Sequence, residues 1–525
     1  MGQSDLWEIP RSWSWTQLSE VGDIVSGGTP STKEPSYWGK EVNWISPADL
    51  TGYSAKTIAR GAKGLSALGL KNCSAKVMPT GSIHFSSRAP IGYIAISSEP
   101  LATNQGFKSL VPASGVLNEF IYYYLKGSKQ LAEERASGTT FRELSGAAFS
   151  QLPLPLAPEH EQHRIVAKID ELFSELDKGV KSLKTARKQL KVYRQAVLKH
   201  AFEGKLTAQW REENKDRLET ADQLLARIRS EREARYQQQL EDWKAAVKDW
   251  EAKGKPGKKP SKPKKPEIIL RCDDKGVPRS PDGWLWLRFG DLCSHVRNGI
   301  AEKPTGNTGA KIFRISAVRP MEFAIDDVRY IDNQDGRYDE YFLQLGDLVF
   351  TRYNGSRAYV GVCAEYRSEG THLFPDKLIQ TKLAVPSILP SYIEKAVNCG
   401  ASREFIGRRI RTTAGQSGVS GSDIKAIPVP ICCEAEQAAI SALLSEVMSR
   451  IGQLLAEIDR NLVRGEGLRQ SILKKAYSGQ LVEQDPNDKP ASVLLERIRA
   501  EKAALADKPK QTTRRKGPSG VERVD

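Results

Sequence analysis

The chain has 525 residues, 39% of them hydrophobic and 27% charged, so it can bury more than one core and is neither disordered nor fibrous. No apolar run approaches the roughly 18 residues of a membrane span, and residues 1–10 lack the basic and apolar profile of a signal peptide, so we expect a cytoplasmic protein. A net charge of +15 favours a polyanionic partner, of which nucleic acid is the commonest.

The first part of the chain has the pattern of a globular mixed α/β module. It begins at Pro10-x-x-Trp13-x-Trp15 and continues with short β-type runs that glycine, proline and serine interrupt. The clearest runs are residues 42–45, 81–85 and 91–96, and residues 117–131 are helical in pattern. We assign this module, module 1, to residues 1–158.

A long amphipathic segment follows, from about residue 159 to residue 206. Its apolar residues recur at alternating steps of four and three over about five heptads, which is typical of a coiled coil. Such a helix would extend about 60 Å, further than a small domain is wide, so we interpret it as a spacer. The alternative is a single amphipathic helix packed on a globular core. The seam, meaning the apolar stripe, consists of Ile165, Ile169, Leu172, Leu176, Leu183, Leu190 and Val197, with Gly179, Ala186 and Tyr193 on the same stripe.

A second helix and a basic linker complete the first half. Residues 221–234 (ADQLLARIRSEREA) are helical in pattern, and the helical region extends over residues 159–252. Residues 253–266 are almost wholly lysine, proline and glycine, which predicts an extended, solvated linker, assigned to residues 253–271. The alternative is a segment that touches phosphates. The later part of the second helix keeps four-three spacing through Tyr236, Leu240, Trp243, Val247 and Trp250.

The second half repeats the first. Residues 427–482 align with residues 152–207 without a gap, at a constant offset of 275, and Glu161-Gln162 lies over Glu436-Gln437. We assign module 2 to residues 272–433, a second helical region to residues 434–507 and a disordered tail to residues 508–525. The second seam consists of Ile440, Leu444, Val447, Ile451, Leu454, Ile458, Leu468 and Ile472, with interruptions at Asn461 and Gly465.

These patterns predict an α+β protein with two mixed α/β modules and two long helices. Because both seams have the same register, we expect the two helices to pair with each other. If they pair antiparallel as a coiled coil, the modules lie at opposite ends and a pseudo-twofold axis relates the two repeats.

A search for catalytic motifs finds none, and we assign no catalytic or metal-binding residue. The chain has no phosphate-binding loop of the Gly-x-x-x-x-Gly-Lys-Ser/Thr type and no glycine-rich turn for a cofactor. His160-Glu161-Gln162-His163 lacks the His-Glu-x-x-His spacing of a zinc helix, so we interpret it as a solvated helix start. The seven cysteines include no Cys-x-x-Cys pair, which favours reduced thiols.

Polar and basic residues gather in the loops of both modules. Arginine can bind guanine bidentately, asparagine and glutamine can bind adenine, and serine or threonine can contact phosphates or base edges. Any one of these residues by itself fits an ordinary surface loop, and only their gathering favours DNA contact. The candidates in module 1 are Thr29, Ser31, Lys33, Ser86, Ser87, Arg88, Gln105, Lys108, Thr139, Thr140 and Arg142. The candidates in module 2 are Arg297, Asn298, Arg352, Tyr353, Asn354, Ser356, Arg357, Arg411, Thr412, Thr413, Gln416 and Ser417.

Several of these motifs occur together in a known family. A module that ends in Leu152-Pro153-Leu154-Pro155, the helix start Glu161-Gln162-x-Arg164-Ile165-Val166, and Ala201-Phe202-Glu203-Gly204-Lys205-Leu206 with its echo at residues 476–481 resemble the specificity subunit of type I restriction-modification systems. The resemblance covers nearly the whole chain. The second copy departs from the pattern at Ala439, where the first copy has Arg164, and at Gly465.

The resemblance implies a role for each part. Each module would be a target recognition domain that reads one half of a bipartite sequence in double-stranded DNA, and the helices would set the spacing and dock two modification subunits. Those partners would carry S-adenosylmethionine and methylate adenine, while restriction subunits would use ATP and Mg and cleave. The chain itself would hold no cofactor and would not be an enzyme. The rival hypotheses are a coiled-coil scaffold with two globular heads and a self-contained nuclease-methylase.

Overall fold

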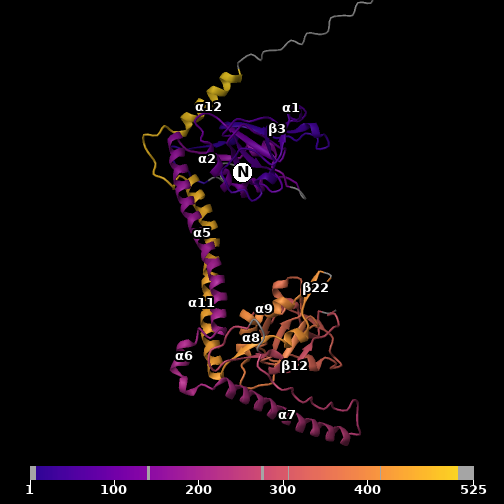
Figure 1. Cartoon of the computed structure of the whole chain (residues 1–525). Coiled ribbons are helices and arrows are strands. Elements are labelled where there is room, and N and C mark those ends of the chain that lie inside the picture. Colours follow the sequence, from indigo (N-terminus) through magenta and orange to yellow (C-terminus); the bar gives the residue numbers. More distant parts are fainter. Residues whose placement is uncertain (1–6, 139–141, 273–276, 305–306, 414, 507–525) are drawn as a thin grey trace, which may run out of the picture. The chain divides into compact units, whose positions relative to one another are not determined.

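The computed structural model describes residues 7–138, 142–272, 277–304, 307–413 and 415–506 (Figure 1). The chain divides into two compact units: unit 1 combines residues 1–184 with residues 459–525, and unit 2 comprises residues 185–458. Unit 1 therefore takes its described residues from both ends of the chain. The structure is a mixture of helices and sheets, which confirms the α+β class.

Module 1 is built around a five-stranded sheet in the order β2-β9-β6-β7-β4. Its central strand β6 is buried along its whole length, as expected for a short apolar run in the middle of a sheet. The strands are β2 (Gly22–Ser26), β4 (Thr57–Ile58), β6 (Ile83–Ser86), β7 (Ile94–Ser97) and β9 (Phe107–Pro112). A second sheet, β5-β3-β8, contains β3 (Trp38–Ile45), β5 (Gly64–Leu65) and β8 (Ala102–Thr103). The helices are α1 (Ala67–Lys71), α2 (Asn118–Gly127), α3 (Lys129–Glu134) and α4 (Gly146–Ser150).

Module 2 repeats this framework. Its strands β12, β21, β17 and β19 stand in the same order as β2, β9, β6 and β7, and β16-β13-β20 corresponds to β5-β3-β8. The strands are β12 (Cys293–Asn298), β13 (Ala310–Phe313), β16 (Val328–Ile331), β17 (Leu348–Thr351), β19 (Cys363–Glu365), β20 (His372–Leu373) and β21 (Leu378–Leu383). Two further sheets contain β14 (Val318–Arg319) with β15 (Glu322–Phe323), and β18 (Tyr353–Asn354) with β23 (Gln416–Gly418) and β22 (Arg411–Thr413). The helices are α8 (Pro390–Val397), α9 (Gly400–Arg409) and α10 (Gly421–Lys425).

The chain enters and leaves each module along one pair of strands. In module 1, β1 (Ser14–Gln17) runs antiparallel to β10 (Pro153–Leu156), with Ser14 opposite Leu156. In module 2, β11 (Leu285–Arg288) pairs in the same way with β24 (Pro428–Ile431), with Leu285 opposite Ile431. The entry and the exit of a module are thus hydrogen-bonded neighbours.

The two long helices are α5 (Glu159–Phe202) and α11 (Glu434–Tyr477), each of 44 residues. Each has glutamates in its first turn and basic residues in its last turn, which suits the helix dipole. Each ends just before a glycine in the left-handed region, Gly204 with φ of 71° and Gly479 with φ of 72°. Only glycine adopts this conformation readily, so the two glycines fix where the helices stop.

In each unit, the end of one long helix packs against the start of the other. In unit 1 the beginning of α5, including Ile165 and Ile169, shares a core with Leu473 and Tyr477 at the end of α11. In unit 2 the roles are reversed, because Val197 and Phe202 share a core with the beginning of α11. Arg469 also pairs with Asp177 within unit 1. Each long helix therefore serves both units.

The observed seam departs from the predicted one near the middle of each helix. Leu454 and Leu468 are 48% and 43% exposed, and Gly179 and Tyr193 also face solvent. The buried stripe passes instead through neighbouring positions. A straight α-helix has about 3.6 residues per turn and drifts by about 20° per heptad relative to a 3.5-residue repeat, which moves the contacting stripe by one position. The replacing residues, all half-buried, are Val180 and Arg194 on α5, and Leu455, Leu462 and Arg469 on α11, while Gly465 keeps its seam position and is buried.

A buried glutamate joins each module to the start of its long helix. Glu161 Oε2 accepts a hydrogen bond from Trp13 Nε1 at 2.9 Å in unit 1, and Glu436 Oε2 accepts one from Trp284 Nε1 at 2.8 Å in unit 2. Both carboxylates are 1% exposed. We call these two arrangements the clasps. They explain why Glu161-Gln162 and the two Pro-x-x-Trp motifs recur together in the sequence.

The glutamine beside each clasp acts on the same junction. Gln162 Oε1 accepts from the Leu117 backbone N–H at 2.9 Å, where α2 begins. Gln437 Oε1 accepts from the Leu389 backbone N–H at 3.0 Å, where α8 begins. A side-chain amide thus satisfies an otherwise free N–H at the start of a module helix.

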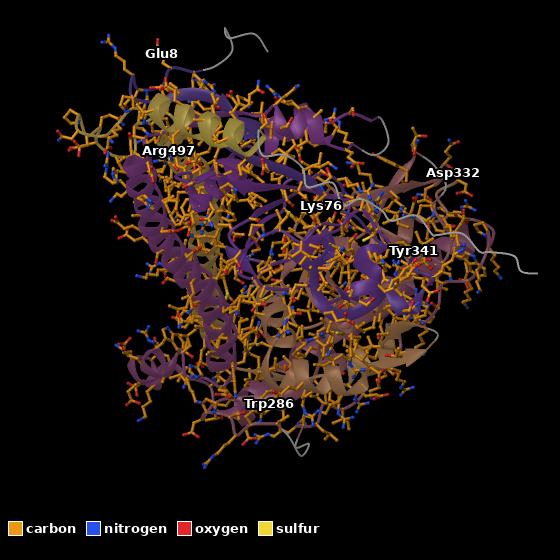
Figure 2. All side chains as sticks on the ribbon, turned by 90° about the horizontal axis from the view of Figure 1, so that it is seen from above. Glu8, Lys76, Trp286, Asp332, Tyr341 and Arg497 are labelled. Carbon is orange, nitrogen blue, oxygen red and sulfur yellow. The ribbon has the colours of Figure 1, made fainter. Side chains whose placement is uncertain are left out.

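The remaining helices are α6 (Ala208–Glu213), α7 (Ala221–Ala252) and α12 (Ala491–Ala506). Leu224, Leu225 and Ile228 of α7 enter the core of unit 2, and the matching residues of α12 enter the core of unit 1. Arg497 of α12, labelled in Figure 2, pairs with Glu159 at 2.9 Å. Among the described residues, no helix combines the length and the apolar character that a membrane crossing requires.

The predicted linker at residues 253–271 is not simply solvated. After α7 the chain turns back, and Trp243 Nε1 donates a hydrogen bond of 3.0 Å to the Pro260 carbonyl (Figure 1). Arg229 and Arg232 donate to the carbonyls of Ile269 and Glu267. The segment lies outside helices and strands and its lysines are exposed, and the aromatic face of the preceding helix also holds it in place.

Candidate nucleic-acid interface

Two candidate segments of module 2, far apart in the sequence, form one small sheet. In this outer sheet, β18 pairs with β23, with Asn354 opposite Ser417, and β22 pairs with β23, with Thr412 opposite Ser417. Figure 1 shows the β22 hairpin standing out from the body of module 2. The fold thus gathers candidates from residues 353–354 and 411–417, as a composite binding surface requires.

The arginines around the outer sheet differ in how firmly the module holds them. Arg352 Nη1 donates to the Asp376 carbonyl at 3.2 Å, and its guanidinium lies 4.7 Å from the centroid of the Tyr353 ring. Arg357 is exposed and donates one hydrogen bond, of 3.0 Å, to the Gly407 carbonyl. Arg411 is exposed as well. Arg352 is therefore mainly structural, whereas Arg357 and Arg411 present guanidinium N–H groups to a ligand. The exposed neighbours from the candidate list are Ser356, Thr412 and Gln416.

Arg297 and Asn298, at the end of β12, have opposite surroundings. Arg297 Nε donates to Gln380 at 3.0 Å, and the guanidinium lies 4.3 Å from the Tyr341 ring centroid and 3.3 Å from Glu340. Asn298 is exposed beside a hollow of about 220 Å³. Asn298 can reach a ligand directly, while Arg297 is held within module 2.

In module 1 the fold brings Arg88 and Lys108 to one carboxylate. Arg88 Nη1 lies 3.5 Å from Glu143 Oε2, and Lys108 Nζ lies 3.6 Å from Glu143 Oε1. Arg142 donates to the Glu133 carbonyl at 3.4 Å, and Arg88 and Arg142 line the same hollow of about 540 Å³. Lys108 is buried, so the candidate cations of this cluster that a ligand can reach are Arg88, which is half-buried, and Arg142, which is exposed.

A second polar group in module 1 lies on the loop before β3 and on the β8–β9 turn. Thr29 Oγ1 donates to Gln105 Oε1, and Ser31 Oγ accepts from the Lys33 backbone N–H at 3.3 Å. Ser31, Lys33 and Gln105 are exposed. These side chains are available for hydrogen bonds to a ligand.

The structure contradicts the surface assignment of Ser86, Ser87 and Ser417. All three are buried. Ser86 Oγ donates to the Pro90 carbonyl at 2.7 Å, and Ser87 Oγ donates to the Gly106 carbonyl at 3.1 Å. Ser417 exchanges a hydrogen bond of 2.9 Å with Thr412. These hydroxyls complete turns within the modules, so they are removed from the candidate interface.

Three candidates remain without a description. Thr139 and Thr140 lie outside the residues that the structure describes, and the side chain of Thr413 lies outside them too. The backbone of Thr413 is described and pairs with Gln416.

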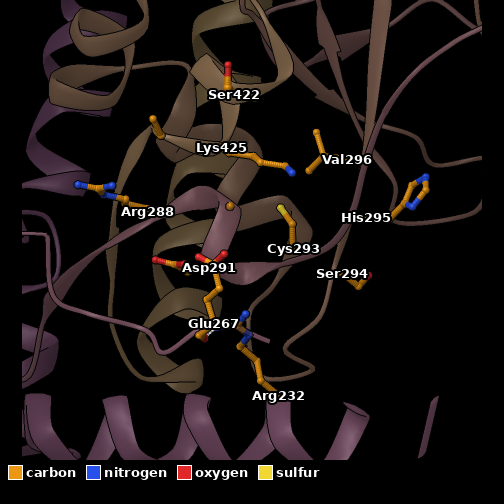
Figure 3. A pocket seen from close by; sticks show the side chains of 12 residues that line it. Arg232, Glu267, Arg288, Asp291, Cys293, Ser294, His295, Val296, Ser422 and Lys425 are labelled. Atoms are coloured by element: carbon orange, nitrogen blue, oxygen red, sulfur yellow. Dashed lines mark hydrogen bonds between the residues drawn. The ribbon is translucent and has the colours of Figure 1, made fainter. Parts of the chain in front are cut away.

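A further hollow, of about 420 Å³, lies between module 2 and α7 (Figure 3). Arg232, Asp291 and Lys425 line it together with Cys293. Burial raises the pKa of the Cys293 thiol well above its ordinary value, which keeps it protonated and a poor nucleophile. Figure 3 shows the imidazole of His295 turned away from that thiol. The hollow therefore offers little for covalent catalysis.

Comparison with known proteins finds relatives in one family. A family model described as the type I restriction modification DNA specificity domain matches residues 10–184. The type I restriction enzyme EcoKI specificity subunit of Escherichia coli is 26% identical over 524 residues, which cover 95% of this chain and 98% of that one. The chain is thus similar along nearly its whole length to a specificity subunit of a type I restriction-modification system.

Two other similarities agree with this one. The MjaIX specificity subunit of Methanocaldococcus jannaschii is 39% identical over 166 residues, which span 31% of this chain and 38% of that protein. A solved chain from the study "Structural basis underlying complex assembly and conformational transition of the type I R-M system" has a TM-score of 0.61 at 16% identity. It covers 90% of this chain and 100% of that one. At this identity the likeness concerns the fold.

The sequence alone did not indicate two features of this chain. Glu143 sits between two candidate cations, and nothing in its local sequence marks it as their partner. The clasps were visible only as repeated landmarks, since a glutamate in a first helical turn ordinarily signals dipole compensation. The recurrence of Trp13 and Trp284 at matching positions was the signal that could have paired them with Glu161 and Glu436.

Proposed function

We propose that this chain is a specificity subunit of a type I restriction-modification system, in which each module reads one half of a bipartite, asymmetric DNA target, and that α5 and α11 pair as an antiparallel coiled coil that sets the spacing. The observation that carries the proposal is the reciprocal packing of the two helices. The start of α5 packs with the end of α11 in unit 1, and the end of α5 packs with the start of α11 in unit 2. One chain thereby builds the same clasped module twice.

This construction suits the symmetry of duplex DNA. Two similar modules related by a pseudo-twofold axis match the approximate dyad of the double helix, and each can approach a major groove about one turn from the other. The exposed arginine and amide side chains of the two modules differ, so the two half-sites would differ in sequence.

We also propose that the chain docks two modification subunits. The support is a set of exposed residues that are identical in both repeats although they make no part of either core. Glu171 and Glu446 are one such pair, and Lys199 and Lys474 are another. Since the repeats have diverged at most exposed positions, retained surface residues indicate two copies of one partner. The other exposed identical pairs are Ala167 with Ala442, Ser174 with Ser449 and Gln195 with Gln470.

In this proposal the chain is a non-catalytic subunit that works in the cytoplasm. The modification subunits would carry S-adenosylmethionine and methylate adenine, and restriction subunits would bring ATP and Mg²⁺ for translocation and cleavage. The competing proposal is a coiled-coil scaffold with two globular heads. A salt-dependent DNA-binding assay separates the two, because a scaffold has no reason to concentrate exposed arginines on module edges.

The proposal is tested by separating spacing from sequence. Inserting seven residues into both α5 and α11 keeps the apolar stripe in phase and lengthens each helix by about 10 Å, or roughly three base pairs of axial rise. The methylated half-sites should keep their bases while the gap between them widens. Three base pairs also turn the duplex by roughly 100°, so the change in gap can be smaller or activity can be lost.

The complementary experiment replaces module 1 with that of a relative. It should change one half-site and leave the gap unchanged. If the heptad insertion instead altered the bases recognised within a half-site, the helices would be reading sequence and the spacing proposal would be wrong.

Partner docking has its own test. Glu171→Arg and Glu446→Arg should each reduce the number of co-purified modification subunits from two to one. Glu457→Arg is the matched control, because Glu457 is equally exposed on α11 but aligns with Ser182. Loss of both partners from either single variant would contradict two independent docking sites.

A further inference from the structure

The segment that follows α7 carries the densest charge in the chain. Residues 253–266 read KGKPGKKPSKPKKP, with seven lysines, four prolines and no acidic residue. We call this segment the strap. It belongs to unit 2, and α12 of unit 1 has no described counterpart to it.

Two tryptophans of α7 hold the strap in place. Trp243 Nε1 donates to the Pro260 carbonyl at 3.0 Å, and Trp250 Nε1 donates to the Pro256 carbonyl at 2.9 Å. Lys262 lies 5.8 Å from the centroid of the Trp243 ring. The strap is thus fixed at several points along the helix, so its lysines are presented in a defined row.

Burial along the strap follows a period of three. Pro260, Pro263 and Pro266 are half-buried, while every lysine from Lys253 to Lys265 is exposed. A polyproline II helix has three residues per turn, so residues three apart share an edge. The proline edge faces α7, and the other two edges carry lysines.

The face of α7 beneath the strap is the aromatic stripe that the sequence showed. Its residues are half-buried rather than exposed, and the strap contacts the stripe at Trp243 and Trp250. The stripe consists of Tyr236, Leu240, Trp243, Val247 and Trp250. The apolar surface of the strap packs against the apolar surface of α7, so the lysines are the part of the strap that is exposed to solvent.

The exposed lysines have little to bind within the protein. Among the residues that the structure describes, no ion pair involves Lys258, Lys259, Lys264 or Lys265. Lys259, Lys262 and Lys265 lie at successive positions of one edge, and at about 3.1 Å per residue they extend over about 19 Å. That length equals roughly six base pairs of duplex, along which phosphates are regularly spaced.

We propose that the strap is a sequence-independent arm that binds the phosphates of duplex DNA beside the half-site read by module 2. The inference rests on the proposed function, because it assumes that module 2 meets DNA. Lysine is a flexible point charge that suits phosphate contact without base recognition. An acidic protein surface is the less favoured partner, because protein interfaces centre on apolar or aromatic anchors, and the apolar groups of the strap are turned toward α7.

The test removes the charge of the lysines and keeps Trp243 and Trp250, which hold the strap in place. In the full chain, assembled with its partner subunits, Lys258, Lys259, Lys264 and Lys265 are replaced with glutamine. The slope of log binding constant against log salt concentration should become shallower by about 0.9 for each lysine that contacts a phosphate. The methylated sequence should stay the same. The matched control replaces the same four lysines with arginine, which retains the charge and should retain the slope.

The possible outcomes are distinct. An unchanged slope in the glutamine variant would overturn the inference. If that variant also lost a partner subunit from the complex, the strap would be assigned to an acidic protein surface. Both leave target-specific binding, and hence the proposed function, intact. Absence of target preference in the unaltered complex would defeat the proposed function. In that case, the salt slope measured on random-sequence duplex would still show whether the strap binds phosphates.

Discussion

Modules 1 and 2 share a framework and differ in the elements added to it. The strand orders β2-β9-β6-β7 and β12-β21-β17-β19 are the same, and the clasps match atom for atom at the tryptophan and the carboxylate. Module 2 adds the three-stranded outer sheet, whereas the corresponding stretch of module 1 has a single described bridge between Ser137 and Glu143. The difference lies where the candidate DNA-binding residues gather. Repeated residues maintain the fold, and unrepeated ones are free to differ in what they bind.

The clasps give the largest expected contrast between the modules. Glu436 also accepts from Arg211 at 2.6 Å, whereas Glu161 has the neutral partner Gln484 and a pKa raised by burial. Glu436→Gln should therefore destabilise unit 2 by about 3–5 kcal/mol, because it leaves the Arg211 charge buried without its partner. Glu161→Gln should cost unit 1 only about 1–2 kcal/mol.

Hydrogen exchange measures the two units of the full chain separately and provides the check on the clasps. In the Glu436→Gln variant, protection from hydrogen exchange should fall mainly in residues 185–458. Equal losses in both units would show that the Arg211 ion pair contributes nothing.

A buried histidine should make module 1 sensitive to acid at a framework position where module 2 has an aliphatic residue. Burial lowers the pKa of His84 on β6 to about 3, and the matching residue of β17 is Val349. Since the folded pKa lies below the ordinary 6.5, the stabilisation is complete above about pH 6.5. It should fall by about 1.4 kcal/mol per pH unit as the pH drops toward 3, or about 3 kcal/mol at pH 4.

The matching substitution, His84→Val, removes this dependence. It should cost about 1 kcal/mol at pH 7, because the Ser109 hydroxyl loses the 2.9 Å hydrogen bond to His84 Nδ1. Urea unfolding between pH 7 and pH 4 should show the two stability curves crossing, with the variant more stable in acid. Parallel curves would mean that His84 is not the titrating group.

The candidate arginines should affect only the half-site of their own module. Arg357→Ala or Arg411→Ala should weaken DNA binding by about 1–3 kcal/mol at one position if the side chain contacts a base. If it contacts a phosphate, the weakening should be uniform and the salt slope should fall by about one. Arg88→Ala should act on the other half-site. Binding titrations on targets with single base changes distinguish these outcomes.

Arg352→Ala serves as the structural comparison. Because its guanidinium is held by the Asp376 carbonyl and the Tyr353 ring, the substitution should lower the stability of module 2. Unchanged affinity and an unchanged salt slope for both exposed arginines would remove the outer sheet from the interface.

The smallest predicted effects concern two glycines of the long helices. Gly465 is buried, and a methyl group there would lie 3.5 Å from Val180, an ordinary contact. Gly465→Ala should stabilise unit 1 by about 1 kcal/mol from helix propensity, and somewhat more from the added contact. Gly179→Ala, where nothing lies within 4 Å, should give the propensity gain alone. Urea midpoints compare the two, and destabilisation by Gly465→Ala would show that close helix approach requires glycine.

The sequence predicted the framework better than the surface. Apolar periodicity and the repeated glycines placed the long helices, and α5 indeed runs from Glu159 to Phe202. The exact stripe was wrong in the middle because helical drift accumulates over several turns, as Leu454 and Leu468 show. Ser86 and Ser87 were misplaced because a hydroxyl next to a glycine or proline turn serves backbone hydrogen bonds as readily as ligands. The contacts that hold the strap could not be predicted, because its partner surface lies on the preceding helix, which local composition does not reveal.

The pairing of β1 with β10, and of β11 with β24, has a consequence for how such genes evolve. Because the two ends of each module are adjacent strands, both crossover points of a recombination event fall at one place in the folded protein. A transferred DNA segment that encodes everything between them needs to match the recipient along those two strands, at the clasp and where the module packs on the long helices. If the modules read DNA as proposed, a single genetic exchange would change the recognised target while the shared helices are inherited unchanged.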